Sequence, residues 1–372
     1  MQEASFDQQL AWTKQHMPRS QKALDRLSIL DGVRLACSMH LDLKMLPLVE
    51  GLRAKGAELF VVTCNPTTVR DEVVGAMRQQ GAQVEAWHAM PADAYRAAIA
   101  QALAWGPTHL CEMGADLSYE LLHDDDLAMV REGVQAGLEA TGSGINRLRK
   151  LDLPYPVFNW DDLPLKEGLH NRHMVGLTTW QAFFARTKLT LHEKQVLVIG
   201  YGSVGQGIAK VARAYGGTVT IVEKDPVRAI EARYDGWPVI TLEEAVAGAD
   251  VLVAATGASG VIGAEHIPLI KDNAFLLNCG HSNIEIDVGA LREYPVEEVM
   301  PAIEAFQTGE KRVFLLAGGA MFNLTAGEGD SLNAFDVTLA LLISGIGHIV
   351  GEGARWSPGV HLLPRAVWAE VI

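Results

Sequence analysis

Short apolar runs alternate with longer amphipathic stretches in the first part of the chain. The runs at 33–39, 58–63 and 83–88 are short and largely apolar, whereas 44–57 and 73–82 repeat apolar positions every three to four residues. The short runs are typical of strands and the longer spacing is typical of helices. Strands that alternate with helices predict parallel strands joined by crossover helices.

The same alternation returns after residue 194. It gives five or six further strand candidates, which are 194–200, 217–225, 238–242, 249–257, 274–280 and 312–319. Between the two regular parts, prolines and polar residues interrupt the periodicity over 151–173, so we expect a hinge there. The pattern predicts an α/β protein of two domains, each a doubly wound, mostly parallel sheet.

Length and charge narrow the kind of partner. The chain has 372 residues, a length typical of two domains, and a formal net charge of −14. Such a charge repels nucleic acid and anionic membrane surfaces, so we expect neither as a partner and favour a small molecule. The N-terminal segment has scattered charges and no continuous apolar stretch, which predicts a cytoplasmic protein without a signal peptide.

The cysteines and the longest apolar stretch both indicate an ordinary core. The four cysteines are far apart and three lie in apolar runs, so we expect reduced, buried thiols and neither disulfides nor a metal site. The apolar stretch 337–350 is shorter than the roughly 20 residues of a membrane span. We therefore expect a core helix there.

A glycine-rich turn stands between the strand candidate at 194–200 and a helical pattern. Gly200, Gly202 and Gly205 form G-x-G-x-x-G, which permits a tight turn, a close approach to a pyrophosphate and close helix packing. Glu223 ends the next strand candidate, where a carboxylate accepts ribose hydroxyls and repels a 2′-phosphate. This context predicts a Rossmann domain that binds NAD; a glycine turn without a ligand is the alternative.

Longer stretches around this turn resemble the S-adenosylhomocysteine hydrolase (adenosylhomocysteinase) family. The matching words are GYGSVGQGIAKVARAYGGTVTIVEKDP, AATGASGVIGAEHIPLIKDNAFLLNCGHSNIEIDV, NLTAGEGD and CSMHLDLKMLPLVEGLRAKGAELFVVTCNP. The resemblance implies a substrate domain (1–176), an inserted NAD domain (177–324) and a return segment to the substrate domain (325–372). It also implies two hinges and a homo-oligomer, either a dimer or a tetramer.

The resemblance further implies a redox cycle on the sugar of a nucleoside. NAD takes a hydride from C3′, the ketone acidifies the C4′ proton, a group leaves C5′, water adds, and the hydride returns. Such a cycle needs a base for the 3′-hydroxyl, a base for C4′–H and an acid for the leaving group. Lys166 matches the lysine that assists 3′-hydroxyl oxidation, His40 the histidine that acts at C5′, and His281 another active-site histidine. A solvated lysine and ordinary core histidines are the alternatives.

Other positions are implied to contact the cofactor. Asn171 and Asn323 match residues at the nicotinamide end. The remaining residues expected along the cofactor groove are Ser203, Val204, Thr256, Cys279 and Gly280.

Departures from the family gather at substrate positions. Met113 and Ala140 replace the second carboxylates of two acidic pairs, which in the family engage the ribose and the reacting centre. His170 replaces an aspartate and Asp330 replaces a histidine, so these two could form an exchanged pair. We expect Met113, Thr141 and Asp330 to lie at the substrate, and His170 to move a proton.

These features leave three functions open. Two carboxylates of the family are absent, whereas the glycine pattern for NAD is present. This combination favours an NAD-dependent enzyme that oxidises a nucleoside transiently and eliminates a group across C4′ and C5′. It would act as a dehydratase, another lyase or a hydrolase on a nucleoside other than S-adenosylhomocysteine. Hydrolysis of S-adenosylhomocysteine or its inosyl analogue is the first alternative. A catalytically silent NAD-binding homologue is the second.

Overall fold

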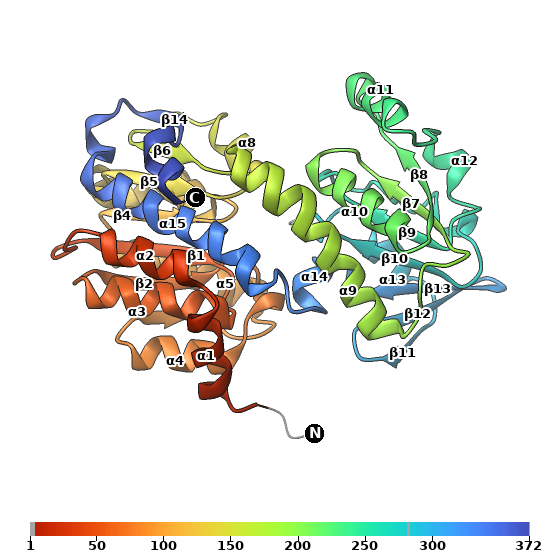
Figure 1. The fold of residues 1–372 in the computed structure, drawn as a ribbon, viewed down its shortest axis with the longest axis horizontal. Helices are drawn as coiled ribbons and strands as arrows, with labels where there is room; N and C mark the ends of the chain where they lie inside the picture. Colours follow the sequence, from red (N-terminus) through yellow and green to blue (C-terminus); the bar gives the residue numbers. More distant parts are fainter. Residues whose placement is uncertain (1–3, 281–282, 372) are drawn as a thin grey trace. The chain divides into compact units, whose positions relative to one another are not determined.

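The structure, a computed structural model, describes residues 4–280 and 283–371 and divides the chain into two units. The first unit contains Met1–Lys166 and Leu332–Ile372, and the second contains Glu167–Ser331. The second unit is therefore inserted into the first along the chain, as Figure 1 shows by its colours.

The unit boundaries differ from the predicted 176/177 and 324/325. Both predicted boundaries fall inside helices, α9 (Val175–Thr187) and α14 (Phe322–Thr325). The two helices pack on each other and α9 also packs on α10 (Ser203–Ala214), so both stay whole within the second unit.

The sheet of the first unit has seven parallel strands in the order β14-β6-β5-β4-β1-β2-β3. Their bounds are β1 Arg34–Met39, β2 Glu58–Thr63, β3 Gln83–Glu85, β4 His109–Glu112, β5 Ala136–Glu139, β6 Pro156–Asn159 and β14 Gly359–Leu362. Strand β1 is buried at five of its six positions, because helices cover both faces of the sheet. That double cover explains why its sequence is a continuous apolar run.

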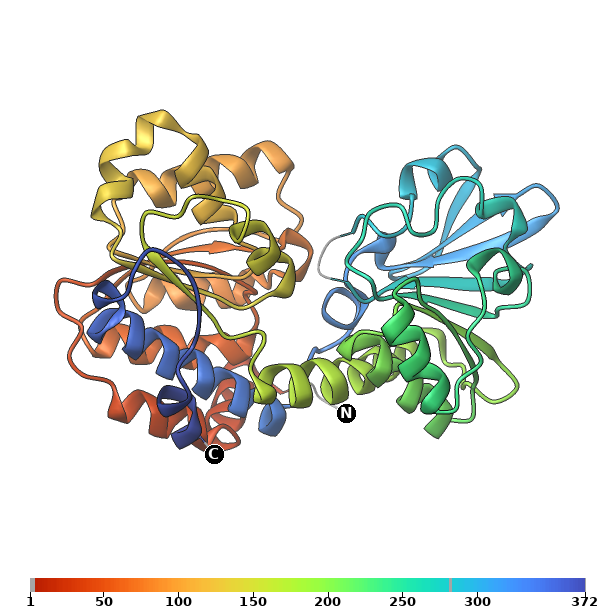
Figure 2. The same ribbon diagram turned by 90° about the horizontal axis from the view of Figure 1, so that it is seen from above.

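Helices form two layers around this sheet, which Figure 2 shows edge-on. One core cluster joins the sheet to α2, α3, α4 and α15, and the other joins it to α5, α6 and α8. The helix bounds are α1 Phe6–Gln15, α2 Pro18–Arg26, α3 Leu46–Ala54, α4 Asp71–Gln79, α5 Ala92–Ala104, α6 Asp116–His123, α7 Ala128–Gly133, α8 Gly142–Leu148, α15 Leu332–Gly351 and α16 Arg365–Trp368.

Helix α15 is longer than the apolar stretch 337–350 suggested. It has 20 residues, which by length and composition alone would suffice to cross a membrane. Its buried residues include Leu339, Leu342 and Ile346, which belong to the core cluster of the first unit. The helix packs against α2 and β5, so it is a core helix as predicted.

The second unit has a seven-stranded sheet in the order β11-β12-β13-β10-β9-β7-β8. Its strands are β7 Gln195–Ile199, β8 Thr218–Val222, β9 Val251–Ala254, β10 Ala274–Asn278, β11 Val296–Met300, β12 Ile303–Thr308 and β13 Lys311–Leu316. Its helices are α9, α10, α11 Pro226–Tyr234, α12 Leu242–Ala245, α13 Val288–Arg292 and α14, preceded by a π-helical turn at Lys166–Met174. The two mostly parallel sheets confirm the predicted fold class.

Two details of this sheet correct the sequence prediction. Strands β11 and β12 form an antiparallel extension that the pattern did not reveal, because β11 is largely exposed and carries little apolar signal. The predicted strand at 238–242 is absent from the sheet and contributes only an isolated bridge between Ile221 and Val239. Most of that segment is exposed, so few apolar contacts hold it as a strand.

Candidate active site

The glycine turn of the second unit has the geometry that dinucleotide binding requires. Gly200 follows β7 with a φ of +100°, a conformation that favours glycine. A Cβ at Gly205 would lie 2.0 Å from the carbonyl oxygen of Gly200, so only glycine permits this close contact. At Gly202 the atom nearest to an added Cβ is 3.5 Å away, which leaves room for a ligand to approach the backbone. Helix α10 begins at Ser203, directly after this turn.

Glu223 is held beside the glycine turn by backbone donors. Its carboxylate accepts hydrogen bonds from the N–H of Tyr201 at 2.6 Å and from the N–H of Asp225 at 2.8 Å. Val204, on α10, packs against the core of the second unit. The glycine cradle and a fixed carboxylate after β8 fit the pyrophosphate and adenosine ribose of NAD.

Two loops of the second unit are joined by a carboxylate that the sequence analysis missed. Glu285 is fully buried, and it accepts hydrogen bonds from the N–H and hydroxyl of Thr256 and from the N–H of Gly257. A Cβ at Gly280 would lie 1.7 Å from its Oε1, so the loop after β10 approaches it closely. A charged residue between two isoleucines, Ile284 and Ile286, was the available signal.

Cys279, directly after β10, is a buried structural thiol. Its Sγ lies 3.3 Å from the hydroxyl of Thr179, and burial raises the pKa of its thiol to about 12. The thiol is therefore protonated at neutral pH and unsuited to act as a nucleophile. All four cysteines are free and buried.

The π-helical turn at Lys166–Met174 packs directly on the cofactor helix α10. A Cβ at Gly207 would lie 1.8 Å from the carbonyl oxygen of Arg172 on this turn. The hydroxyl of Ser203 donates to Glu167 at 2.8 Å. Asn171 lies on the same turn. Asn323, the other residue expected at the nicotinamide end, is buried in α14, where its amide donates a hydrogen bond to the hydroxyl of Thr178 at 3.3 Å. Both residues expected at the nicotinamide end therefore lie in the second unit.

The exchanged pair His170 and Asp330 is in contact. His170 Nδ1 lies 2.5 Å from Asp330 Oδ2, with side-chain exposures of 19% and 3%. The sequence suggested this pairing because each of the two residues differs from the family by the opposite exchange of aspartate and histidine. In the structure the two side chains are in contact. The remaining predicted histidine of this unit, His281, lies outside the described residues.

In the first unit, His40 follows β1 and is oriented by a threonine. Its Nδ1 lies 2.8 Å from the hydroxyl oxygen of Thr68, and that hydroxyl donates its own hydrogen to the carbonyl of Asn65. The Thr68 oxygen therefore accepts, and Nδ1 of His40 carries a hydrogen.

Lys166 is nearly buried beside an acidic and an aromatic residue. Its side chain is 11% exposed, and Nζ lies 3.7 Å from Asp161 Oδ1 and 5.9 Å from the ring centroid of Trp160. The carboxylate limits where the ammonium group can point. An orientation of this kind suits a residue that exchanges a proton at a fixed place.

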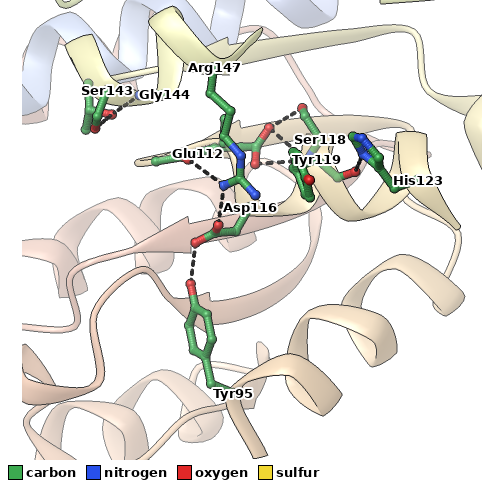
Figure 3. A network of polar contacts seen from close by, with 12 residues as sticks. Tyr95, Glu112, Asp116, Ser118, Tyr119, His123, Ser143, Gly144 and Arg147 are labelled. Carbon is green, nitrogen blue, oxygen red and sulfur yellow. Dashed lines mark hydrogen bonds and ion pairs between the residues drawn. The ribbon is translucent and has the colours of Figure 1, made fainter. Parts of the chain in front are cut away.

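The first carboxylate of each acidic pair points into the fold. Glu112 ends β4 and accepts hydrogen bonds from the N–H and hydroxyl of Ser118 (Figure 3). Glu139 ends β5 and accepts from the N–H groups of Gly114, Ala115 and Thr141, and from the Thr141 hydroxyl. Burial raises the pKa of Glu112 to about 7 and that of Glu139 to about 8, with Glu112 adding to the rise for Glu139. These carboxyl groups stabilise the loops after β4 and β5.

A second layer of the same network surrounds Asp116. Asp116 accepts a hydrogen bond from the hydroxyl of Tyr95 at 2.6 Å and pairs with Arg147 at 2.6 Å, as Figure 3 shows. The Arg147 guanidinium lies 3.7 Å from the ring centroid of Tyr119. The network fixes α6 and α8 on the loops that carry the predicted substrate residues.

The positions of the missing carboxylates are apolar. Met113 is partly buried against the core, and Ala140 is 3% exposed. Thr141, also expected at the substrate, uses its hydroxyl to cap α8 by accepting from the N–H of Gly144 at 3.0 Å. Three of the altered or predicted substrate positions, Met113, Ala140 and Thr141, therefore follow the carboxyl ends of β4 and β5, and two of them lack polar side chains. Asp330, also expected at the substrate, lies in the second unit.

A buried cation near His40 was also missed by the sequence analysis. Lys44 is the single lysine or arginine among the buried residues that the structure describes. Its Nζ lies 3.2 Å from Asp42 Oδ2, and its ammonium group is 5.8 Å from the ring centroid of Phe335. Two opposite charges immediately after an apolar strand were the available signal. Across 4–280 and 283–371, no cluster of three side chains able to hold a metal is found.

The role of the glycine turn in NAD binding can be tested with a substitution that adds a single methyl group. Gly205→Ala is expected to weaken NAD binding strongly, because its Cβ would collide with the Gly200 carbonyl and displace the turn. The amount of NAD that copurifies, measured by mass spectrometry, and the NAD dissociation constant check this result. Gly248→Ala in the same unit is the matched control, since its Cβ would meet no atom closer than 3.8 Å. Equal NAD binding by both variants would contradict the assignment.

Two family models match the chain. The model described as S-adenosyl-L-homocysteine hydrolase, NAD binding domain, matches residues 181–329, and the model described as S-adenosyl-L-homocysteine hydrolase matches residues 7–150. The first match covers the glycine turn, Glu223 and Glu285, and the second covers His40 and the buried carboxylates.

Individual relatives match over nearly the whole chain. An adenosylhomocysteinase of Aeropyrum pernix is 36% identical over 96% of this chain and 88% of its own length. An S-inosyl-L-homocysteine hydrolase of Methanopyrus kandleri is 34% identical over 96% of this chain and 87% of its own. An adenosylhomocysteinase of Thermococcus kodakarensis is 34% identical over 98% of this chain and 88% of its own length.

Proposed function

Because the chain belongs to the S-adenosyl-L-homocysteine hydrolase family and carries its NAD-binding domain, we propose that it is an NAD-dependent enzyme acting on a different nucleoside. The reaction we propose is a transient oxidation of the sugar followed by elimination across C4′ and C5′. Loss of water from C5′ would make it a dehydratase, and later addition of water would make it a hydrolase.

One observation carries the proposed change of substrate. Met113 and Ala140 give the carboxyl ends of β4 and β5 no carboxylate at the positions that the resemblance assigns to ribose binding. The neighbouring carboxyl groups cannot replace them, because Glu112 and Glu139 are buried and hydrogen-bonded to the chain itself. A sugar with the usual hydroxyl pattern would therefore lose two acceptors, and buried polar groups left unpaired are costly.

Groups for two of the three proton transfers in the family's cycle are nevertheless at hand. NAD, when bound, supplies the hydride acceptor for C3′ of the sugar. The glycine turn and Glu223 would hold it, and Lys166 Nζ takes the proton of the 3′-hydroxyl while Asp161 orients the amine. His40, oriented through Nδ1 by Thr68, delivers a proton to the group that leaves C5′.

Hydrolysis of S-adenosylhomocysteine or S-inosylhomocysteine is the second candidate. The identity of 36% to an adenosylhomocysteinase and of 34% to an S-inosyl-L-homocysteine hydrolase favours it. A silent NAD-binding homologue is the third candidate. Against it stand the oriented side chains of Lys166 and His40, which a protein without chemistry would have no need to position.

A panel of substrates separates these candidates. Purified protein loaded with NAD is incubated with S-adenosylhomocysteine, S-inosylhomocysteine, adenosine and inosine, while the absorbance of reduced nicotinamide and the product masses are recorded. We expect transient cofactor reduction and loss of a C5′ group from a nucleoside, with no thioether cleavage. Release of homocysteine at a useful rate would instead establish the second candidate, and silence across the panel would favour the third.

Restoring a carboxylate should change the substrate preference. Met113→Asp is expected to lower elimination from the preferred nucleoside by about tenfold or more and to raise cleavage of S-adenosylhomocysteine, because it returns a charged group to the reacting centre. Rates with both substrates check this result. The control is Met129→Asp, at a residue that is 79% exposed in the same unit. A lower rate with both substrates and unchanged preference would contradict the proposal.

Location and assembly are also proposals. The net charge of −14 supports a protein that binds neither nucleic acid nor anionic membranes, and we propose a cytoplasmic homo-oligomer, a dimer or a tetramer, from the family resemblance. Light scattering of the NAD-loaded protein determines the subunit number.

A further inference from the structure

The contact between His170 and Asp330 has the form of a general-base pair. Asp330 Oδ2 lies 2.5 Å from Nδ1 of His170, and its side chain is 3% exposed. The contact is an ion pair without the direction of a hydrogen bond, and a negative carboxylate so close to Nδ1 favours the form of the ring in which Nδ1 carries a hydrogen. Nε2 is then the ring nitrogen that can take a proton, and the carboxylate stabilises the imidazolium that results.

The imidazole is 19% exposed and can reach a ligand through Nε2. In the described part of the chain, the ring has no hydrogen-bond partner that would occupy Nε2. A buried histidine kept for stability alone normally has both ring nitrogens engaged. One nitrogen held at ion-pair distance from a carboxylate, without hydrogen-bond direction, and one nitrogen left for a ligand suit a proton acceptor that works on a bound molecule.

The pair is carried by an element that packs on the cofactor helix. His170 lies in the middle of the π-helical turn at Lys166–Met174, and π-helical turns occur frequently at functional sites. The same turn contacts α10 through the Arg172 carbonyl at Gly207 and through Glu167 at Ser203. The fold of the second unit therefore ties the position of His170 to the helix that begins at the NAD-binding turn.

The proposed reaction lacks one base, and this pair can supply it. Lys166 serves the 3′-hydroxyl and His40 the leaving group, whereas Met113 stands where the resemblance places a carboxylate of the reacting centre. On the basis of the proposed function, we propose that His170, oriented by Asp330, is the base that removes the C4′ proton. His170 is then a catalytic residue and Asp330 a positioning residue.

The step balances without a further reactant. Once C3′ is a ketone, the C4′–H bond breaks and its proton forms a bond to Nε2 of His170. The electron pair left on C4′ forms the second bond between C4′ and C5′. The bond from C5′ to the leaving group breaks with its electron pair, and that group takes up a proton that originates in solvent water. An α,β-unsaturated ketone and the free leaving group result.

The test separates this proton transfer from the preceding oxidation. Wild-type protein loaded with NAD is incubated with adenosine, and separately with inosine, in D2O. Reduced nicotinamide is followed by absorbance, and deuterium at C4′ of the recovered nucleoside is measured by NMR. We expect His170→Gln to keep the absorbance change and to lose deuterium incorporation by about 10²-fold to 10⁴-fold. His173→Gln, at an exposed histidine on the same turn, is the matched control and should behave like wild type.

Two further variants distinguish a catalytic pair from a structural one. Asp330→Asn should slow deuterium incorporation and leave cofactor reduction intact, because a neutral amide cannot stabilise the imidazolium as a carboxylate does. The double variant His170→Asp with Asp330→His keeps one acid and one imidazole but exchanges their places. If it keeps cofactor reduction and lacks deuterium incorporation, the imidazole is needed at position 170. Restored incorporation would show that the pair acts only through its mutual contact, and would overturn the assignment.

Failure of the assignment and failure of the proposed function give different results. Wild-type incorporation by His170→Gln, with normal cofactor reduction, overturns the role of His170 alone. A wild-type protein that neither reduces its cofactor nor incorporates deuterium with either nucleoside overturns the proposed function, and the assignment falls with it. Thermal melting of each variant verifies that it is folded.

Discussion

Lys166→Met is expected to slow the reduction of bound NAD by a nucleoside by a factor of about 10² to 10⁴. Methionine has a similar length but cannot take the proton of the 3′-hydroxyl, and the contact of 3.7 Å to Asp161 is lost. Stopped-flow absorbance of reduced nicotinamide, with adenosine or inosine as the nucleoside, measures the rate. Because oxidation is the first chemical step, deuterium incorporation at C4′ should fall by the same factor.

A matched control protects this result from an unspecific effect of charge. Lys150→Met removes an exposed lysine of the same unit, and it should leave the rate unchanged. The amount of bound NAD must be the same in both variants and in the wild type. If Lys166→Met reduces its cofactor at the wild-type rate, another group accepts the hydroxyl proton and the role given to Lys166 is wrong.

Glu139→Ala is expected to lower the free energy of unfolding by about 2 to 5 kcal/mol. The carboxyl group is fully buried and accepts hydrogen bonds from the N–H groups of Gly114, Ala115 and Thr141. Alanine would leave these donors without a partner in the interior, and the deleted atoms would leave a cavity. Urea unfolding followed by circular dichroism and tryptophan fluorescence measures the loss.

The control for this prediction is an exposed acid in the same unit. Glu132→Ala removes a carboxylate from the surface and should change the free energy of unfolding by no more than about 0.5 kcal/mol. Equal stability of the two variants would show that the loops after β4 and β5 do not depend on Glu139. It would also remove the reason to regard that carboxyl group as unavailable to a ligand.

Much of the fold was predictable because it depends on local pattern. Strands covered on both faces by helices must be apolar along their length, so β1 and β7 appear in the sequence as continuous runs. The glycine turn was equally clear, since the close contact between Gly205 and Gly200 admits only glycine. The hairpin of β11 and β12 was not predictable, because an exposed edge carries no strong apolar signal.

The candidate site was likewise predictable only in part from the sequence. Residue type and spacing pointed to Lys166, His40 and the NAD residues through their resemblance to a family, and the family models confirm that family and its NAD-binding domain. Glu285 and Lys44 were not predicted, because a charged residue stands out only when it is buried. Burial depends on tertiary packing, which the sequence does not show.

By itself, the sequence determined that this chain is a two-domain α/β protein of the family with an NAD-binding domain, and it predicted that four positions expected at the substrate are altered. Those conclusions depend on which residues occur and in what order. Only the tertiary structure decided which carboxylates point inward, since adjacent residues at a strand end face opposite ways. It alone joined His170 to Asp330, because 160 positions of chain separate two side chains that fold to 2.5 Å from each other.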